Sequence, residues 1–391
     1  MTIPDIKFIV PILIQLRLIC FRDSRLISLV RKLLILPTIW LALSNTHRGN
    51  FDGIGPIGFV WAVTLFVGCL KSVDLGFTHR HSIRYIGTHG QRSEESKLDT
   101  STDLGWSAFF DLLTNLRGVG WAWGYTWDIR DIRGISQAHF LRHTLTDIVK
   151  HHFLSTFSVA LLAHAMDNND ILFTQSIFLS DVAQTLLLGA AAWSGLSLGY
   201  SLVSLLVYTY SRITHSHFDP LRWPPLLNDP LKMHSVRDFW SNRWHSLFKR
   251  QFLLCGYTPV VKVCRWVGIR DDMARLLGVQ GAFLVSALMH EWSIRNALNH
   301  SIHPATLPSI AFFQASAAAV ALETTIQHLS GRRVGGALGA LWAWSFLLLT
   351  GIPMMRHWLH GGTLGYVVPP QLWSLKRIVT PFGFLAHADN L

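Results

Sequence analysis

Apolar segments of about twenty residues recur along the whole chain, and they restrict it to a membrane-embedded helical fold. A helix needs around 20 residues to cross about 30 Å of hydrocarbon. Half of the 391 residues are hydrophobic and only 15% are charged, whereas soluble domains average about 25% charged residues. We therefore predict an all-α, polytopic bundle of transmembrane helices, with spans at residues 29–46, 56–75, 183–210, 276–294, 306–327 and 336–354.

Three weaker apolar segments leave the number of membrane helices between six and nine. They are residues 6–21, 153–166 and 250–268. Because no Pro/Ser-rich linker divides the chain, we predict one membrane domain over residues 1–391, which begins with N-terminal membrane helices in residues 1–75.

The net charge is +11, and the Lys and Arg residues lie in short loops between apolar segments; two long polar stretches, residues 76–151 and 211–250, carry many of them. Basic loops of membrane proteins tend to face the cytosol, so we expect both stretches to be cytosolic loops. An even number of crossings must then separate them, and residues 153–166 and 183–210 supply two. Since the cations do not line one solvated face, we expect the lipid bilayer and no nucleic acid as a partner.

An ionisable pair, His290 and Glu291, lies near the end of the apolar segment 276–294. Such residues are costly to place in lipid, so they point first to function. Helical spacing puts Ser286, His290 and Ser293 on one stripe. A buried neutral imidazole is suited to act as a general base. Taken alone, however, His290 is also compatible with a satisfied core histidine.

The polar stretch 211–250 contains a second candidate element. Four prolines predict an extended linker, and Ser235 followed by Asp238 resembles a capping box that starts a helix at about Val236. On a continuous α-helix one polar face would carry Asp238, Asn242, His245 and Lys249, within an aromatic surround that includes Trp240 and Trp244. An amphipathic helix on the membrane surface is the alternative.

Three segments together resemble a known family. They are Arg-Asp-Phe-Trp-Ser-Asn-Arg-Trp-His at 237–245 with its Pro-Pro-Leu prelude at 224–226, Ala-Leu-Met-His-Glu-Trp at 287–292, and Arg-Gly-Val-Gly-Trp at 117–121. The first two resemble the wax synthase domain of the membrane-bound O-acyltransferases. The third resembles the fungal branch, which includes acetyltransferases of terpenoid and meroterpenoid biosynthesis. The resemblance covers about residues 110–360.

The resemblance implies acyl transfer from coenzyme A to a hydroxyl group, with His290 at the position of the catalytic histidine. His245 stands where many relatives have Asn, so it is expected either to orient a substrate or to titrate. Asn242 is a further candidate for orienting the thioester or stabilising the oxyanion. Glu291 is expected to support His290 without bonding to it, because adjacent helical residues diverge by about 100°.

The implied partners are acyl-CoA, as a co-substrate and not a bound cofactor, and a hydrophobic alcohol; no metal is required. Arginines are suited to bind the phosphates of coenzyme A. The full set of expected substrate-binding residues is Trp240, Arg243, Trp244, Arg117, Trp121 and Ser286. For the tryptophans of residues 105–127, a position at the bilayer interface is the alternative.

The fungal resemblance favours acetyl transfer to a terpenoid alcohol in the endoplasmic reticulum, and long-chain acyl transfer to a fatty alcohol is the alternative. Two other classes stay open. Twenty histidines, with His139 and His143 at ligand spacing, suggest a membrane di-iron oxygenase, although no later His-x-x-His-His follows. The second alternative class is a transporter that uses His290 and Glu291 as a proton relay, although no inverted repeat in the sequence supports it.

Overall fold

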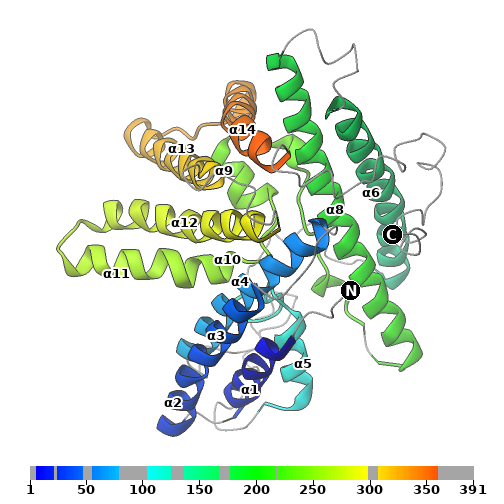
Figure 1. Ribbon diagram of the computed structural model, residues 1–391, viewed down its shortest axis with the longest axis vertical. Coiled ribbons are helices and arrows are strands. Elements are labelled where there is room, and N and C mark those ends of the chain that lie inside the picture. The colour runs from blue at the N-terminus through cyan, green and yellow to red at the C-terminus, as the bar shows by residue number, and fades with distance from the viewer. Residues whose placement is uncertain are drawn as a thin grey trace.

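The computed structural model describes residues 6–21, 24–46, 55–78, 104–124, 136–166, 177–216, 218–297 and 307–359 (Figure 1). Every regular element in these ranges is a helix. The predicted all-α fold is therefore confirmed.

The helices follow one another along the chain with short connections. The N-terminal half contains η1 (Ile6–Phe8), α1 (Ile9–Ile19), α2 (Arg25–Leu33), α3 (Ile35–Thr46), α4 (Gly55–Phe77), α5 (Trp106–Thr114), α6 (Gln137–Met166) and α8 (Ile177–Ile213). The C-terminal half contains η4 (Pro220–Arg222), η5 (Pro230–Lys232), α9 (Val236–Asp238), η6 (Phe239–Arg243), α10 (Lys249–Phe252), η7 (Leu253–Tyr257), α11 (Thr258–Trp266), α12 (Asp271–Ala297), α13 (Pro308–Ser330) and α14 (Gly336–Trp358).

Six stretches of helix in the described residues are long and apolar enough to cross a membrane. They are Arg25–Asn45, Gly58–Phe77, Phe178–Ile213, Asp271–Asn296, Pro308–Ser330 and Gly336–Trp358. Each coincides with one of the six strong predicted segments, so the chain is an integral membrane protein. The first span is divided between α2 and α3, which meet at Leu34.

The three weaker segments are helical, but none of them is among these spans. Residues 6–21 form α1, whose 11 residues extend over only about 17 Å. Residues 250–268 are divided among α10, η7 and α11. Residues 153–166 are the second half of α6, which begins at Gln137. The prediction of a loop is therefore wrong for residues 137–151, which are helical. No Gly or Pro interrupts this part of the sequence, so the helix can continue through it.

Figure 1 shows how the helices are arranged around α12. The helices α6 and α8 lie side by side as one pair, and α11 and α12 form another. α12 also packs against α4 and α13. The turn η7 approaches α12 very closely, since a Cβ on Gly256 would lie 2.3 Å from the carbonyl oxygen of Gly281. Small residues at this crossing are thus required by packing.

The N-terminal helices form their own core. Phe8, Leu16 and Leu65 are almost fully buried there, together with Trp121. Gln15 ties three helices together, since its amide donates to the carbonyl oxygens of Arg31 and Ser72. This core supports α4, against which α12 packs.

Candidate active site

The segment 219–245 turns sharply before it reaches the predicted helix. Pro220 and Pro230 each begin a short 3₁₀ turn, so the predicted extended linker contains two helical turns. Ser235 then adopts an extended conformation and its hydroxyl accepts a hydrogen bond from the amide of Asp238 at 3.0 Å. The predicted helix start at Val236 is confirmed. Asp238 completes the cap one residue further out, because its carboxylate accepts from the amide of His234 at 3.1 Å.

The predicted continuous α-helix over the motif is wrong beyond Asp238. Residues Phe239–Arg243 form a π-helical turn, and the amide of Trp244 donates to the carbonyl of Phe239 five residues earlier. Trp244 is extended and ends the helix. His245 therefore does not share a helical face with Asn242. π-helical turns of this kind occur often at functional sites.

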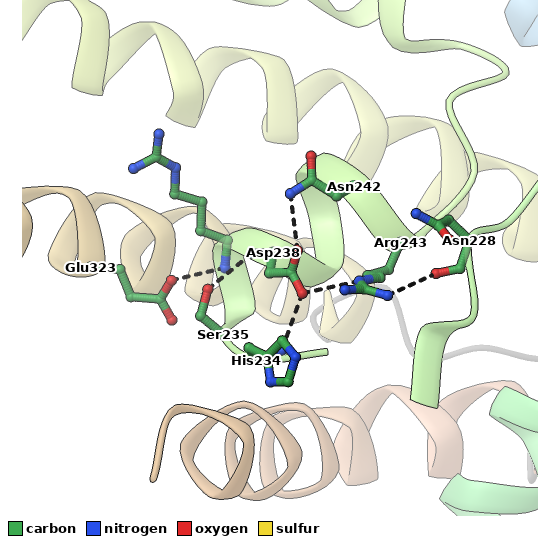
Figure 2. Close-up of polar contacts among 8 residues, drawn as sticks. Asn228, His234, Ser235, Asp238, Asn242, Arg243 and Glu323 are labelled. Atoms are coloured by element: carbon green, nitrogen blue, oxygen red, sulfur yellow. Dashed lines mark hydrogen bonds and ion pairs between the residues drawn. The ribbon is translucent and has the colours of Figure 1, made fainter. Parts of the chain in front are cut away.

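The carboxylate of Asp238 collects the polar side chains of this turn (Figure 2). Asn242 donates to it at 2.9 Å and Arg243 at 3.1 Å, while Arg243 also reaches the carbonyl oxygen of Asn228 at 3.5 Å. Burial raises the pKa of Asp238, but these donors and the charge of Arg243 outweigh it and hold the pKa below its usual value. Asn242 is exposed, so it belongs to this network and is directed away from the histidines.

Glu323 on α13 anchors the same turn, and the sequence did not single it out. Its carboxylate accepts from the amides of Val236 and Arg237, each at 2.9 Å, and from the indole of Trp342 on α14, also at 2.9 Å. Figure 2 shows this carboxylate facing the start of α9. The first amides of a helix lack partners within the helix. The sequence could have indicated this role, because Glu323 is an acidic residue inside the predicted membrane span 306–327.

His290 is held by a hydrogen bond within α12. Its Nδ1 lies 2.8 Å from the carbonyl oxygen of Ser286. A carbonyl only accepts, so Nδ1 carries the proton and Nε2 keeps a lone pair. Ser286 and Ser293 are both buried, as expected for a stripe that avoids lipid.

Aromatic rings enclose the imidazole of His290 and connect it to the motif turn. The ring of Phe313 lies 4.5 Å from it and that of Trp358 stacks at 6.0 Å. Trp240 packs against the same Phe313 at 5.6 Å. The indole nitrogen of Trp240 is buried, and it has no hydrogen-bond partner among the described residues. Phe313 thus lies against both sequence motifs.

His245 lies near this enclosure, beside Trp244 at 5.5 Å between ring centroids. Burial, and then the positive charges that His290 and Arg117 can carry, lower the pKa of His245 to about 3. The fold thus places His245 within electrostatic reach of His290, although 45 residues separate them. Its Nδ1 is buried and lacks a hydrogen-bond partner within the described ranges.

Glu291 faces away from the ring of His290, as expected from the helical geometry. Its carboxylate pairs with Arg295 at 2.8 Å, accepts from the amide of Ser309 at 3.2 Å and lies 3.6 Å from His357. These contacts connect α12 to the start of α13 and the end of α14.

Arg117 and Trp121 have structural contacts. Arg117 is buried, which lowers its pKa, and it donates to the carbonyl of Pro224 at 2.7 Å and to Tyr200 at 3.3 Å. It therefore connects the 117–121 passage to the Pro-Pro prelude. Trp121 is buried in the N-terminal core and donates to Asp111 at 2.5 Å.

A di-iron site would require several metal-ligating side chains close together among the described residues. No group of three or more His, Cys, Asp or Glu side chains gathers there. His139 and His143 lie 5.2 Å apart on α6, whereas His79, His81, His217 and His360 lie outside the described residues.

The matched sequence segment includes both histidines. Residues 223–315 match the model of the membrane bound O-acyl transferase family. This segment is therefore similar to the membrane bound O-acyl transferases. It begins at the Pro-Pro prelude and ends on α13, two residues beyond Phe313. The predicted family resemblance is therefore confirmed.

The relatives that the chain resembles fall into two groups. The chain is 24% identical to acetyltransferase ataH of Aspergillus terreus over 279 residues, which cover 63% of the chain and 88% of that relative. It is 30% identical to acetyltransferase TRI7 of Fusarium sporotrichioides over 116 residues, which cover 30% of the chain and 26% of that relative. Putative long-chain-alcohol O-fatty-acyltransferase 10 of Arabidopsis thaliana is 37% identical over 67 residues, 17% of the chain.

The plant match covers only 20% of its relative. No solved structure has significant similarity to the chain. The relatives in both groups are nevertheless named as acyltransferases.

Proposed function

We propose that this protein is an O-acyltransferase that moves an acyl group from coenzyme A to the hydroxyl of a hydrophobic alcohol. The observation that carries the proposal is the tautomer of His290, because the bond from Nδ1 to Ser286 leaves Nε2 available as a base. The aromatic enclosure of Phe313 and Trp358 provides the water-poor surroundings that such a base requires.

The reaction proceeds by direct attack of the alcohol on the thioester. Nε2 of His290 removes the hydroxyl proton as the oxygen bonds to the thioester carbon. The resulting tetrahedral intermediate then breaks its C–S bond, and the departing coenzyme A sulfur takes the proton from His290. General base assistance of this kind contributes about 10² to 10⁴ in rate.

His245 takes the orienting role in this mechanism. With a pKa of about 3 it is neutral near pH 7. A neutral imidazole donates one hydrogen bond, as the amide of Asn does. It can therefore orient the thioester or stabilise the negative charge on its oxygen. Nδ1 of His245 and the indole N–H of Trp240 lack hydrogen-bond partners among the described residues, and a polar substrate atom would satisfy them.

We propose acetyl as the acyl group and a terpenoid or meroterpenoid alcohol as the acceptor. The resemblance of residues 117–121 to the fungal branch supports this choice, as does the similarity to two fungal acetyltransferases. The plant relative is named for long-chain alcohols and fatty acyl groups, so fatty alcohol acylation is the second candidate. Members of the resembled family usually reside in the endoplasmic reticulum, which supports the same location for this protein. We also propose that residues 1–391 form one domain.

The test is expression in yeast and assay of the membrane fraction. Membranes receive acetyl-CoA or palmitoyl-CoA together with a panel of terpenoid alcohols and fatty alcohols, and product masses are read. One added acetyl group on a terpenoid is the expected result. Palmitoyl esters of fatty alcohols would favour the second candidate, and no ester with any pair would contradict both.

A further inference from the structure

A second polar cluster lies inside the membrane domain, apart from the two histidines. Lys71 and Asp74 on α4, and Thr78 directly after its end, follow one another at spacings of three and four residues and line a cavity together with Arg250 of α10 and Trp123. Lys71 is only 8% exposed, although it belongs to the span Gly58–Phe77. Cations are rarely placed in a span without a partner or a role.

The single carboxylate of this cluster, that of Asp74, is hydrogen-bonded to Arg250 and Thr78 and not to Lys71. Asp74 receives two hydrogen bonds from Arg250, at 2.7 and 2.8 Å, and a third from the hydroxyl of Thr78 at 2.6 Å. Arg250 also donates to that hydroxyl at 2.9 Å. Asp74 and Arg250 therefore neutralise each other.

Asp74 lies within electrostatic range of Lys71, but two cations, Lys71 and Arg250, share this one carboxylate, so the cluster keeps a net charge of +1. Its ammonium lies 5.6 Å from the ring of Trp123, which also stacks on Arg250 at 4.6 Å. The ammonium of Lys71 makes no hydrogen bond within the described residues. An ammonium carries three donors, and an unpaired buried charge costs several kcal/mol.

We propose that this cavity, bounded by Lys71, Trp123 and Arg250, binds an oxygen of a phosphate group. Its volume of about 10 Å³ is roughly the space needed for one water-sized atom. One phosphate oxygen fills that space, and its charge satisfies Lys71. Because α4 ends at Phe77, where the predicted cytosolic stretch begins, the rest of the ligand lies towards the cytosolic end of the helix.

Coenzyme A is the expected source of the phosphate, and this part of the inference rests on the proposed function. Arg250 follows His245 by five residues, and ring contacts run from His245 to Phe248 at 6.2 Å and on to Phe252 at 6.2 Å. The phosphate cavity is thus connected to the motif by one short aromatic segment. A phospholipid headgroup offers the same chemistry and is the alternative source.

The first experiment measures the KM of two acetyl donors with membranes that contain either the wild type or the Lys71→Gln variant. Acetyl-CoA carries phosphates, whereas S-acetyl-pantetheine has the same thioester without them. The expected result is a rise of about tenfold in the KM for acetyl-CoA, the typical value of one charge-assisted hydrogen bond. The KM for S-acetyl-pantetheine should not change. Lys71→Arg should restore most of the loss, and Lys262→Gln, at an exposed position on α11, is the matched control. Equal effects on both donors, or none, would overturn the proposal.

A second experiment does not depend on catalysis. The thermal midpoint of the solubilised wild type is measured with coenzyme A, pantetheine or phosphatidic acid, and again for Lys71→Gln. Stabilisation by coenzyme A alone that the variant loses assigns the cavity to the donor. Stabilisation by phosphatidic acid alone assigns it to lipid, and the absence of both contradicts the phosphate cavity. If coenzyme A stabilises but no acetyl is transferred, the proposed function fails while the cavity stands.

Discussion

Nδ1 of His290 lies 2.8 Å from the carbonyl oxygen of Ser286, one turn earlier on α12. Every α-helix has such a carbonyl four residues back, so a histidine can fix its own tautomer without help from a distant residue. Here the result is an imidazole whose Nε2 keeps its lone pair among the rings of Phe313 and Trp358. The proposed mechanism needs no carboxylate partner for the base, and Glu291 accordingly serves packing.

Replacing Glu323 should disturb the motif turn without touching substrate. Glu323→Ala would leave the amides of Val236 and Arg237 without acceptors, and each unsatisfied buried donor costs about 1–3 kcal/mol. Thermal unfolding in detergent should therefore show a clear loss of stability. Glu323→Gln keeps one acceptor oxygen and should lose less. Thr325→Ala, at an exposed position on the same helix, is the control. Equal midpoints for wild type and Glu323→Ala would disprove the anchor.

Local features were predictable from the sequence. Each of the six spans depends on the composition of about twenty consecutive residues, and the cap of Ser235 on Asp238 joins residues three apart. The bond from His290 to Ser286 is likewise local. Hydrophobic length and short-range helical geometry therefore account for the fold class and the base.

Long-range contacts were not predictable. The anchor from Glu323 to Val236 joins residues 87 apart, and that from Arg250 to Asp74 joins residues 176 apart. The π-helical turn at Phe239 could not be read from helical periodicity, which assumes 3.6 residues per turn. Consequently the predicted polar face was wrong, and Asn242 points to Asp238 instead of joining His245.

Substitution of His245 by Asn should preserve acyl transfer within about tenfold, since an amide supplies the same single hydrogen bond to substrate. Substitution by Leu removes the donor and should lower kcat by about 10² or more, as loss of one oxyanion donor does in other enzymes. Labelled acetyl transfer in membranes measures both. A His245→Leu variant that works as well as His245→Asn would remove His245 from the mechanism.

Because the pKa of His245 is low in the folded protein, we expect the free energy of unfolding to depend on pH. The folded state resists protonation until about pH 3, whereas the unfolded chain takes up the proton at about 6.5. The contribution of this residue is therefore complete above pH 6.5 and falls as pH decreases towards 3, by up to about 1.4 kcal/mol per pH unit.

Thermal midpoints measured from pH 7.5 to 5 should fall more steeply for wild type than for His245→Asn. The variant lacks only this titrating group, so the difference between the two curves isolates it. Parallel curves would mean that His245 is not buried as the structure places it.

Acetyl transfer by His290→Ala tests whether His290 is the general base. Microsomes containing equal amounts of wild-type and variant protein are assayed with labelled acetyl-CoA and an alcohol that the wild type accepts. We expect a fall in kcat of about 10² to 10⁴, the usual contribution of a general base, with the protein still present at normal levels. Turnover near that of the wild type would contradict the assignment of His290 as the base.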